Sequence, residues 1–302
     1  MKNPPSKAAW LRRLIKKGVV ALPGAFNAAT ALLVERCGFQ AVYISGAGLA
    51  NGVAGLPDVG LLSLNEVVCQ ASYIARSVQI PAIVDGETGF GGPLHTVHAV
   101  EAFEQAGLAG VHFEDQVMPK RCGHLSGKQL VSPEEMAEKI KAAVEARSDP
   151  NFLIIARTDA RGVNGMGDAI FRAHCYWEAG ADVIFPEALE SMKEFKEFAR
   201  KVKAPLMANM TEFGRTPYLS VKEFAEMGYR MVLFPMTPFR VAMKAVQQAL
   251  SELKNTGTQK RLLGRMQTRQ ELYDLVEYSS YEELDRKLSR KPPISEKRRS
   301  QK

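Results

Sequence analysis

Eight short apolar segments recur along the chain, and they constrain its fold more than any other feature. Each is almost continuously hydrophobic, without the strict alternation of a strand that faces water on one side, and each ends in polar or glycine-containing residues. This pattern is typical of parallel strands buried on both faces of a sheet. The predicted strands are residues 19–26, 41–48, 81–89, 110–116, 152–159, 182–188, 205–210 and 231–236.

Segments with helical spacing separate these strands. "NAATALLVERCG" (27–38) and "LHTVHAVEAFEQAG" (94–107) both end at a glycine that can serve as a helix C-cap. "SPEEMAEKIKAAVEARS" (132–148) begins with a serine N-cap, a proline and two glutamates, all of which favour a helix start. Strands and helices alternating over about 250 residues predict an α/β fold, a (β/α)8 TIM-type barrel. A doubly wound sheet fits less well, because the glycines of "SGAGLANG" (45–52) are spaced one residue too far apart for a dinucleotide-binding loop.

The chain continues beyond the last predicted strand. Residues 237–257 predict an outer helix, and residues 267–288 supply more helix than a minimal barrel needs. We expect residues 1–288 to form a single barrel domain with a C-terminal helical appendage, which could cap its own barrel or pack on another subunit. Residues 289–302 are expected to be a basic, disordered tail.

Composition argues against membrane and nucleic-acid partners. The formal net charge is +7, but residues 287–302 hold seven of the cations and a single acid, so the body is nearly balanced. A basic tail is usually solvated, and an RNA-binding arm is the alternative. No stretch reaches the roughly 18–20 apolar residues of a membrane span, and no signal peptide is evident. With four unpaired cysteines, we expect a cytoplasmic protein.

Polar residues gather at the ends of the predicted strands, where barrel enzymes carry their chemistry. Asp85 and Glu87 lie two apart on a segment expected to be extended, so both side chains should point the same way. With Glu114 from the next strand they predict an oxygen-only site, which favours Mg²⁺ or Mn²⁺ over Zn²⁺. The other polar residues at these ends are Ser45, Asp115, Arg157, Asp159, Glu187, Asn209, Thr211 and Glu212.

The segment "PKRCGHLSGK" (119–128) places a cysteine among cations. Zinc binding is disfavoured, because the chain has no second pair of Cys or His ligands at suitable spacing. Lys120, Arg121 and His124 should stabilise the Cys122 thiolate, lowering its pKa toward a range useful for proton transfer. Nucleophilic attack by this thiol stays open. The remaining cysteines fall in helical segments and are expected to be core residues: Cys37, Cys69 and Cys175.

These motifs resemble the isocitrate lyase/phosphoenolpyruvate mutase superfamily. "PKRCGH", "VDGETGFGG" and "EDQ" carry the resemblance, with support from "YISGAG", "GLPDVG", "ARTDA", "ANMTEFG" and "GTQKRLLGRMQTRQELY". It extends from about residue 8 to residue 288 and is nearest to bacterial 2-methylisocitrate lyases. It implies Mg²⁺-dependent cleavage of 2-methylisocitrate to pyruvate and succinate in propionate catabolism, the methylcitrate cycle. Hydrolysis of oxaloacetate, or lysis of isocitrate or another substituted malate, is the alternative.

The resemblance also implies roles for individual residues. Cys122 would protonate the succinate carbanion, His124 would belong to the catalytic loop, and either Tyr43 or a metal-bound water would be the initiating base. Phe185 and Leu233 would line a pocket with room for the substrate methyl group. Residues implied to bind the di- or tricarboxylate substrate or to order the loop are Ser45, Gly46, Ala47, Gly123, Arg157, Glu187, Asn209, Met210, Thr211, Arg240 and Arg269.

The resemblance has one departure and one further implication. The family usually carries Asp-x-Asp at the third strand, whereas this chain has Glu87 as the second acid, so Glu87 would ligate the metal either directly or through water. The C-terminal helices match a family habit of exchanging a helix between subunits, which implies a homotetramer.

Overall fold

The computed structural model describes residues 5–289 and contains a barrel of eight parallel strands. The hydrogen-bonded order is β6-β5-β4-β3-β2-β1-β8-β7, and a bridge between Ile184 and Leu206 nearly closes the ring. The predicted (β/α)8 fold is confirmed, and every strand lies within its predicted segment. The strands are β1 (Val20–Ala25), β2 (Val42–Ile44), β3 (Ala82–Asp85), β4 (Gly110–Glu114), β5 (Leu153–Thr158), β6 (Val183–Pro186), β7 (Met207–Asn209) and β8 (Met231–Phe234).

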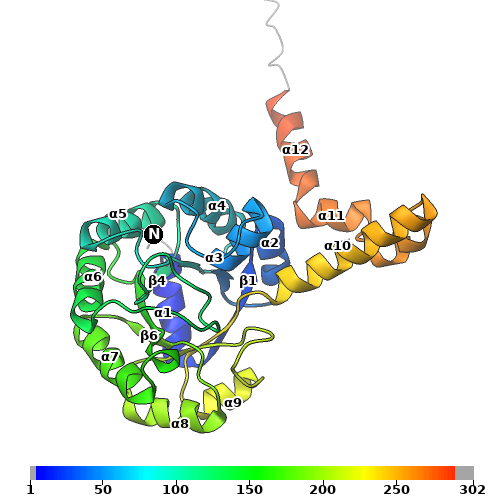
Figure 1. Ribbon diagram of the computed structural model, residues 1–302. Helices are drawn as coiled ribbons and strands as arrows, with labels where there is room; N and C mark the ends of the chain where they lie inside the picture. The colour runs from blue at the N-terminus through cyan, green and yellow to red at the C-terminus, as the bar shows by residue number, and fades with distance from the viewer. Residues whose placement is uncertain (1–4, 290–302) are drawn as a thin grey trace, which may run out of the picture. The chain divides into compact units, whose positions relative to one another are not determined.

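Helices surround the barrel (Figure 1). The outer helices are α2 (Ala28–Arg36), α4 (Leu64–Ser77), α5 (Pro93–Gln105), α6 (Pro133–Ala146), α7 (Met166–Glu178), α8 (Met192–Lys201) and α9 (Val221–Glu226). Short turns of helix follow two strands: α3 (Gly46–Leu49) with η1 (Ala50–Ala54), and η2 (Ala160–Gly162). The predicted caps are present, since Ser132 accepts from the Glu135 N–H at the start of α6 and Gly38 has a φ of +85° just past α2.

The first helix, α1 (Lys7–Lys17), plugs one end of the barrel. Its side chains Leu11 and Ile15 pack in one apolar cluster with inward-facing strand residues such as Leu22, Ile83 and Leu153. A second cluster fills the space between the strands and the outer helices. The strands are therefore buried on both faces, as their continuous hydrophobicity indicates.

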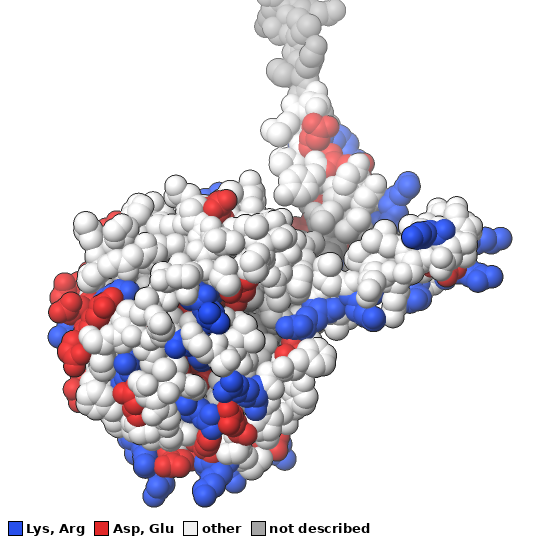
Figure 2. Space-filling view, viewed as in Figure 1, with Lys and Arg blue, Asp and Glu red and all other residues white. Residues whose placement is uncertain are grey.

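The chain divides between Val246 and Gln247 into two compact units. The second unit holds the end of α10 (Thr237–Thr256), η3 (Lys260–Arg265), α11 (Arg269–Leu275) and α12 (Tyr278–Leu288). Apart from Ser289, the predicted basic tail lies outside the described residues. None of the described helices is both long enough and apolar enough to cross a membrane. Acidic and basic side chains are interspersed over the visible face of the first unit (Figure 2).

The expectation that three cysteines belong to the core is wrong. Cys37 and Cys69 are exposed, and Cys175 is only partly buried. Cys69 lies in α4, whose buried face is formed by Val67, Ala71 and Ile74, so its thiol is on the other side of the helix.

Candidate active site

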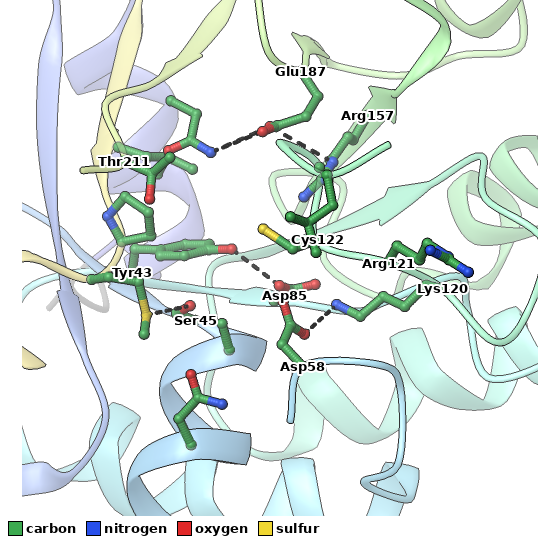
Figure 3. A pocket seen from close by; sticks show the side chains of 18 of the residues that line it. Tyr43, Ser45, Asp58, Asp85, Lys120, Arg121, Cys122, Arg157, Glu187 and Thr211 are labelled. Carbon is green, nitrogen blue, oxygen red and sulfur yellow. Dashed lines mark hydrogen bonds and ion pairs between the residues drawn. The ribbon is translucent and has the colours of Figure 1, made fainter. Parts of the chain in front are cut away.

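A cavity of about 360 Å³ opens at the carboxyl ends of the strands (Figure 3). The parallel register explains the convergence, because Glu114 pairs with Arg157, Arg157 with Phe185, and Asn209 with Leu233 on adjacent strands. Thirteen of the predicted site residues line the cavity: Tyr43, Ser45, Ala47, Asp85, Cys122, Gly123, Arg157, Phe185, Glu187, Asn209, Thr211, Leu233 and Arg240.

Six predicted residues do not line this cavity. Gly46, Glu87, Glu114 and His124 contact residues that do, as described below. Met210 is 4% exposed and belongs to the apolar cluster behind the strands. Arg269 is the first residue of α11 in the second unit.

Asp85 and Glu87 converge above Gly46. A β-carbon added at Gly46 would lie 2.6 Å from Glu87 Oε1 and 2.9 Å from Asp85 Oδ2, so only glycine fits there without a shift. The Gly46 N–H donates to Asp85 Oδ2 at 3.2 Å. The predicted reason for the convergence is wrong, however. Strand β3 ends at Asp85, and Glu87 has a φ of +54°, so a left-handed turn rather than an extended segment aims its carboxylate.

Lys120 lies against these carboxylates. It is 3% exposed, and its ammonium group pairs with Asp58 at 2.8 Å and with Glu87. Burial would lower the Lys120 pKa, but Glu114, Asp85 and Glu87 outweigh it and raise that pKa well above its ordinary value. Lys120 therefore neutralises these carboxylates. The prediction that it stabilises the Cys122 thiolate is wrong. Sequence reasoning also missed Asp58, although "GLPDVG" was among the motifs quoted for the resemblance.

The predicted metal ligands form a desolvated set of oxygens. Burial raises the pKa of Glu87 to about 7 and raises the Glu114 pKa well above its usual range, despite the opposing charges of Lys120 and Arg157. Both Glu114 carboxylate oxygens are buried without a hydrogen bond, and the nearest cation is Arg157 Nη1 at 3.2 Å from Oε2. Within residues 5–289, no three His, Cys, Asp or Glu side chains are assembled closely enough to form a ready metal site.

Cys122 lies among Tyr43, Asp85 and Arg157 (Figure 3). Cys122 is an exposed residue, yet the protein around its thiol partly excludes water, and this desolvation raises the thiol pKa. The nearby Glu187 carboxylate adds to the effect. A hydrogen bond from the His124 backbone and the charge of Arg157 oppose it only partly. The expectation of a lowered pKa is therefore wrong, and the thiol is protonated at neutral pH.

Glu187 organises the opposite side of the cavity. His124 Nε2 lies 2.9 Å from its carboxylate, and Asn209 Nδ2 lies 3.3 Å from both of its oxygens. Burial would raise the Glu187 pKa, but Arg157 and His124 hold it well below its usual range. The Arg215 N–H also donates to His124 Nδ1, so His124 connects the cysteine loop with the loop that follows β7.

Tyr43 reaches the cavity from β2. Its hydroxyl is 2.8 Å from His112 Nε2 and donates to Asp85 Oδ2 at 3.4 Å. Burial and the Asp85 charge raise the Tyr43 pKa well above its usual value, while burial lowers the His112 pKa to about 4. Sequence reasoning missed His112, although a single imidazole inside the apolar strand "GVHFE" is a signal of a buried polar partner.

The carboxyl ends of the barrel strands carry several acids, an arginine and a thiol around one cavity. This arrangement is typical of an enzyme that acts on a small carboxylate. The family model of phosphoenolpyruvate phosphomutase matches residues 11–254, and the chain belongs to this family. It is 55% identical to a 2-methylisocitrate lyase from Aeropyrum pernix, over 93% of this chain and 91% of the relative. The resemblance seen in the sequence is therefore confirmed.

Solved structures agree with this assignment. A 2,3-dimethylmalate lyase superposes with a TM-score of 0.89 at 34% identity, covering 95% of this chain and 96% of that one. A phosphonopyruvate hydrolase, solved in complex with oxalate and Mg²⁺, has a TM-score of 0.84 at 27% identity and covers 93% of this chain and 99% of that one.

Proposed function

We propose that this enzyme cleaves 2-methylisocitrate to pyruvate and succinate, as a step of propionate catabolism. The observation that carries the proposal is the position of Cys122, which lines one cavity together with Arg157 and Glu187. The relative from Aeropyrum pernix supports the same substrate.

In the proposed reaction, a base removes the proton of the substrate hydroxyl and the adjacent C–C bond breaks in a retro-aldol sense. One fragment leaves as pyruvate, and the electron pair of the broken bond stays on the succinate fragment, delocalised into its carboxylate. Cys122 then donates its thiol proton to that carbanion. Preorganised hydrogen-bond donors stabilise negative charge that develops during a reaction. In this cavity the proposed donors are Arg157, Asn209 and Thr211. The hydroxyl of Tyr43, held by His112 and Asp85, is the proposed contact of the substrate hydroxyl.

We propose Mg²⁺, or Mn²⁺, as the cofactor. These ions prefer hard oxygen donors, which are supplied here by Asp85, Glu87 and Glu114. Both carboxylate oxygens of Glu114 are buried and accept no hydrogen bond, which suits the binding of a cation. When bound, the ion would stabilise negative charge on the oxygens of the α-keto acid. Glu87, which pairs with Lys120, would ligate the ion either directly or through water.

The proposed choice of substrate rests on Phe185 and Leu233, which are among the residues that line the cavity. Because one methyl group is worth only about 1–3 kcal/mol in an apolar pocket, we expect a preference over isocitrate rather than its exclusion. A lyase for another substituted malate is the second candidate, since the 2,3-dimethylmalate lyase shares the fold closely.

We also propose a homotetramer with exchanged C-terminal helices, located in the cytoplasm. Neither α10 nor α12 has a buried residue, and their apolar side chains are exposed, as Leu250 (60%) and Tyr281 (70%) illustrate. Exposed apolar surface of this kind marks an interface. The four free thiols support a reducing compartment.

The first test measures pyruvate release from 2-methylisocitrate and from isocitrate, with Mg²⁺ and with a chelator. We expect chelator-sensitive release, faster from the methylated substrate. Cys122→Ser should lower kcat by at least about 10²-fold, because a serine hydroxyl is a much weaker acid. Cys69→Ser, which changes an exposed thiol, is the matched control and should leave kcat unchanged. If neither substrate released pyruvate, or if Cys122→Ser kept full activity, the proposed lyase mechanism would be refuted.

A further inference from the structure

Lys128 does not line the cavity, yet it is one of the most buried cations of the first unit. The residue is 7% exposed, and its ammonium group lies behind the loop that carries Cys122. It donates to the backbone carbonyl of Gly123 and to Asp159 Oδ1, the latter at 2.7 Å. A lysine is rarely buried unless its charge is paired, and here the pairing joins two separate elements. Lys128 therefore connects the residue next to Cys122 with the end of β5.

The Asp159 end of this connection is rigid. Asp159 is fully buried and accepts from Arg157 Nε at 2.9 Å and Nη2 at 3.2 Å. Its own N–H donates to Asp115 Oδ1 at 2.9 Å. Asp115 in turn accepts from Thr158 and Tyr176, each at 2.8 Å. These bonds fix Asp159 to β4, β5 and α7, so it can serve as an anchor for a loop.

The Gly123 end is the part that needs an anchor. A β-carbon added at Gly123 would lie 2.4 Å from Glu187 Cγ and 2.5 Å from Arg157 Nη2, so the loop backbone rests directly on two side chains of the cavity. Cys122, one residue earlier, lines the same cavity as Gly123. The bond from Lys128 to the Gly123 carbonyl closes the loop into a ring between residues 123 and 128.

We propose that Lys128 is a positioning residue, which holds the Cys122 thiol over the cavity by tying the Gly123 carbonyl to Asp159. Its effect on catalysis rests on the proposed lyase function, whereas its effect on the loop does not. A thiol displaced by about 1 Å from the carbanion would donate its proton poorly, at a cost of roughly 10²-fold in rate. Without the ammonium group, the Gly123 carbonyl loses a donor and the loop opens.

The test is Lys128→Met, which keeps an unbranched, largely apolar side chain one atom shorter and removes the ammonium group. Iodoacetamide labelling, resolved by peptide mass spectrometry, reports the alkylation rate of each cysteine separately. We expect Cys122 to react about 10-fold faster in the variant across the pH range, and kcat to fall roughly 10²-fold with a smaller change in KM. Cys37, exposed at the end of α2, should react at an unchanged rate in both proteins.

Lys7→Met is the matched control. Lys7 is also a partly buried lysine that donates to backbone carbonyls, those of Ala75 and Val78, but it does so from α1. This variant should lose stability without changing the Cys122 alkylation rate or kcat.

Two results separate the inference from the function. Unchanged Cys122 alkylation in Lys128→Met would overturn the positioning role, even if kcat fell. Faster Cys122 alkylation, in a protein whose wild type cleaves neither substrate, would uphold the positioning role and overturn the lyase.

Discussion

The protonation state of the Cys122 thiol depends largely on groups that lie far from it in the sequence. Lys120 and Arg121 are adjacent in the chain, yet Lys120 pairs with Asp58 and Glu87, and the exposed Arg121 makes its hydrogen bond to the Ser126 carbonyl. Desolvation by the cavity wall and the Glu187 carboxylate favour the protonated thiol, and they outweigh the His124 backbone hydrogen bond and the Arg157 charge, which favour the thiolate. Such a thiol suits a proton donor better than a nucleophile.

This proton state gives a pH dependence with a definite sign. A general acid works only while protonated, so kcat/KM should fall as pH rises through the thiol pKa. Because that pKa is raised, the alkaline decline should lie above the ordinary value of about 8.5 rather than near neutrality. A pH–rate profile measures it. A decline centred near pH 7 that disappeared in Cys122→Ser would show a lowered pKa and contradict the structure.

Sequence reasoning at this scale located the residues better than it described their states. Most predicted site residues do line one cavity, because strand ends in a barrel converge whatever their side chains are. The pKa shifts could not be predicted, because they depend on burial and on partners from other loops and strands. Asp58 acts in this way on Lys120, and His112 on Asp85.

Among the elements, β4 is held at its carboxyl end by a buried polar network. Asp115, the residue after β4, accepts from Tyr176 and lies 3.2 Å from Arg172 Nη1, and both partners belong to α7. Arg172 also donates to the Val131 carbonyl just before α6. The strand end that holds Glu114 and leads into the cysteine loop is thus fixed by a buried polar network, which is costly to leave partly satisfied.

Asp115→Ala should therefore destabilise the fold by roughly 3–5 kcal/mol, because the buried Thr158 and Tyr176 hydroxyls and the Asp159 N–H would all lose their acceptor. It would also remove the more buried of the two carboxylates beside Arg172. Asp168→Ala provides the comparison. It removes the second, more accessible acid that contacts Arg172, at 2.9 Å, and should cost less than about 1 kcal/mol. Urea unfolding of both variants measures the difference. Equal losses would show that the buried network has no special role.

The elements themselves were largely predictable. Strand positions followed from apolar runs, and the caps at Ser132 and Gly38 followed from residue type. The turn at Glu87 was not predictable, because a left-handed glutamate has no sequence signal and is imposed by its neighbours.

At the scale of the whole molecule, the last described helix, α12, contacts α11 but has no buried residue. Apolar residues of α12 recur on one face at Tyr281, Leu284 and Leu288, each more than half exposed. A helix with such a face is stabilised mainly by what it packs against, and here we propose a second copy of the chain.

The proposed assembly predicts that Leu250→Asp combined with Leu284→Asp lowers the mass of the particle measured by light scattering. A charge at the centre of an apolar interface loses its hydration without a partner, so subunits should separate. Leu94→Asp changes a residue that is 79% exposed at the start of α5, and should leave the mass unchanged. A wild-type protein that is already monomeric would refute the assembly.

The plug formed by α1 has a consequence for the order of events in a catalytic cycle. With Leu11 and Ile15 packed at one end of the barrel, the cavity lies at the other end, where the strands finish. On the proposed function, one substrate molecule would enter at that end and two products would leave there. The product bound nearer the opening would have to dissociate before the deeper one, so α1 would impose an ordered release.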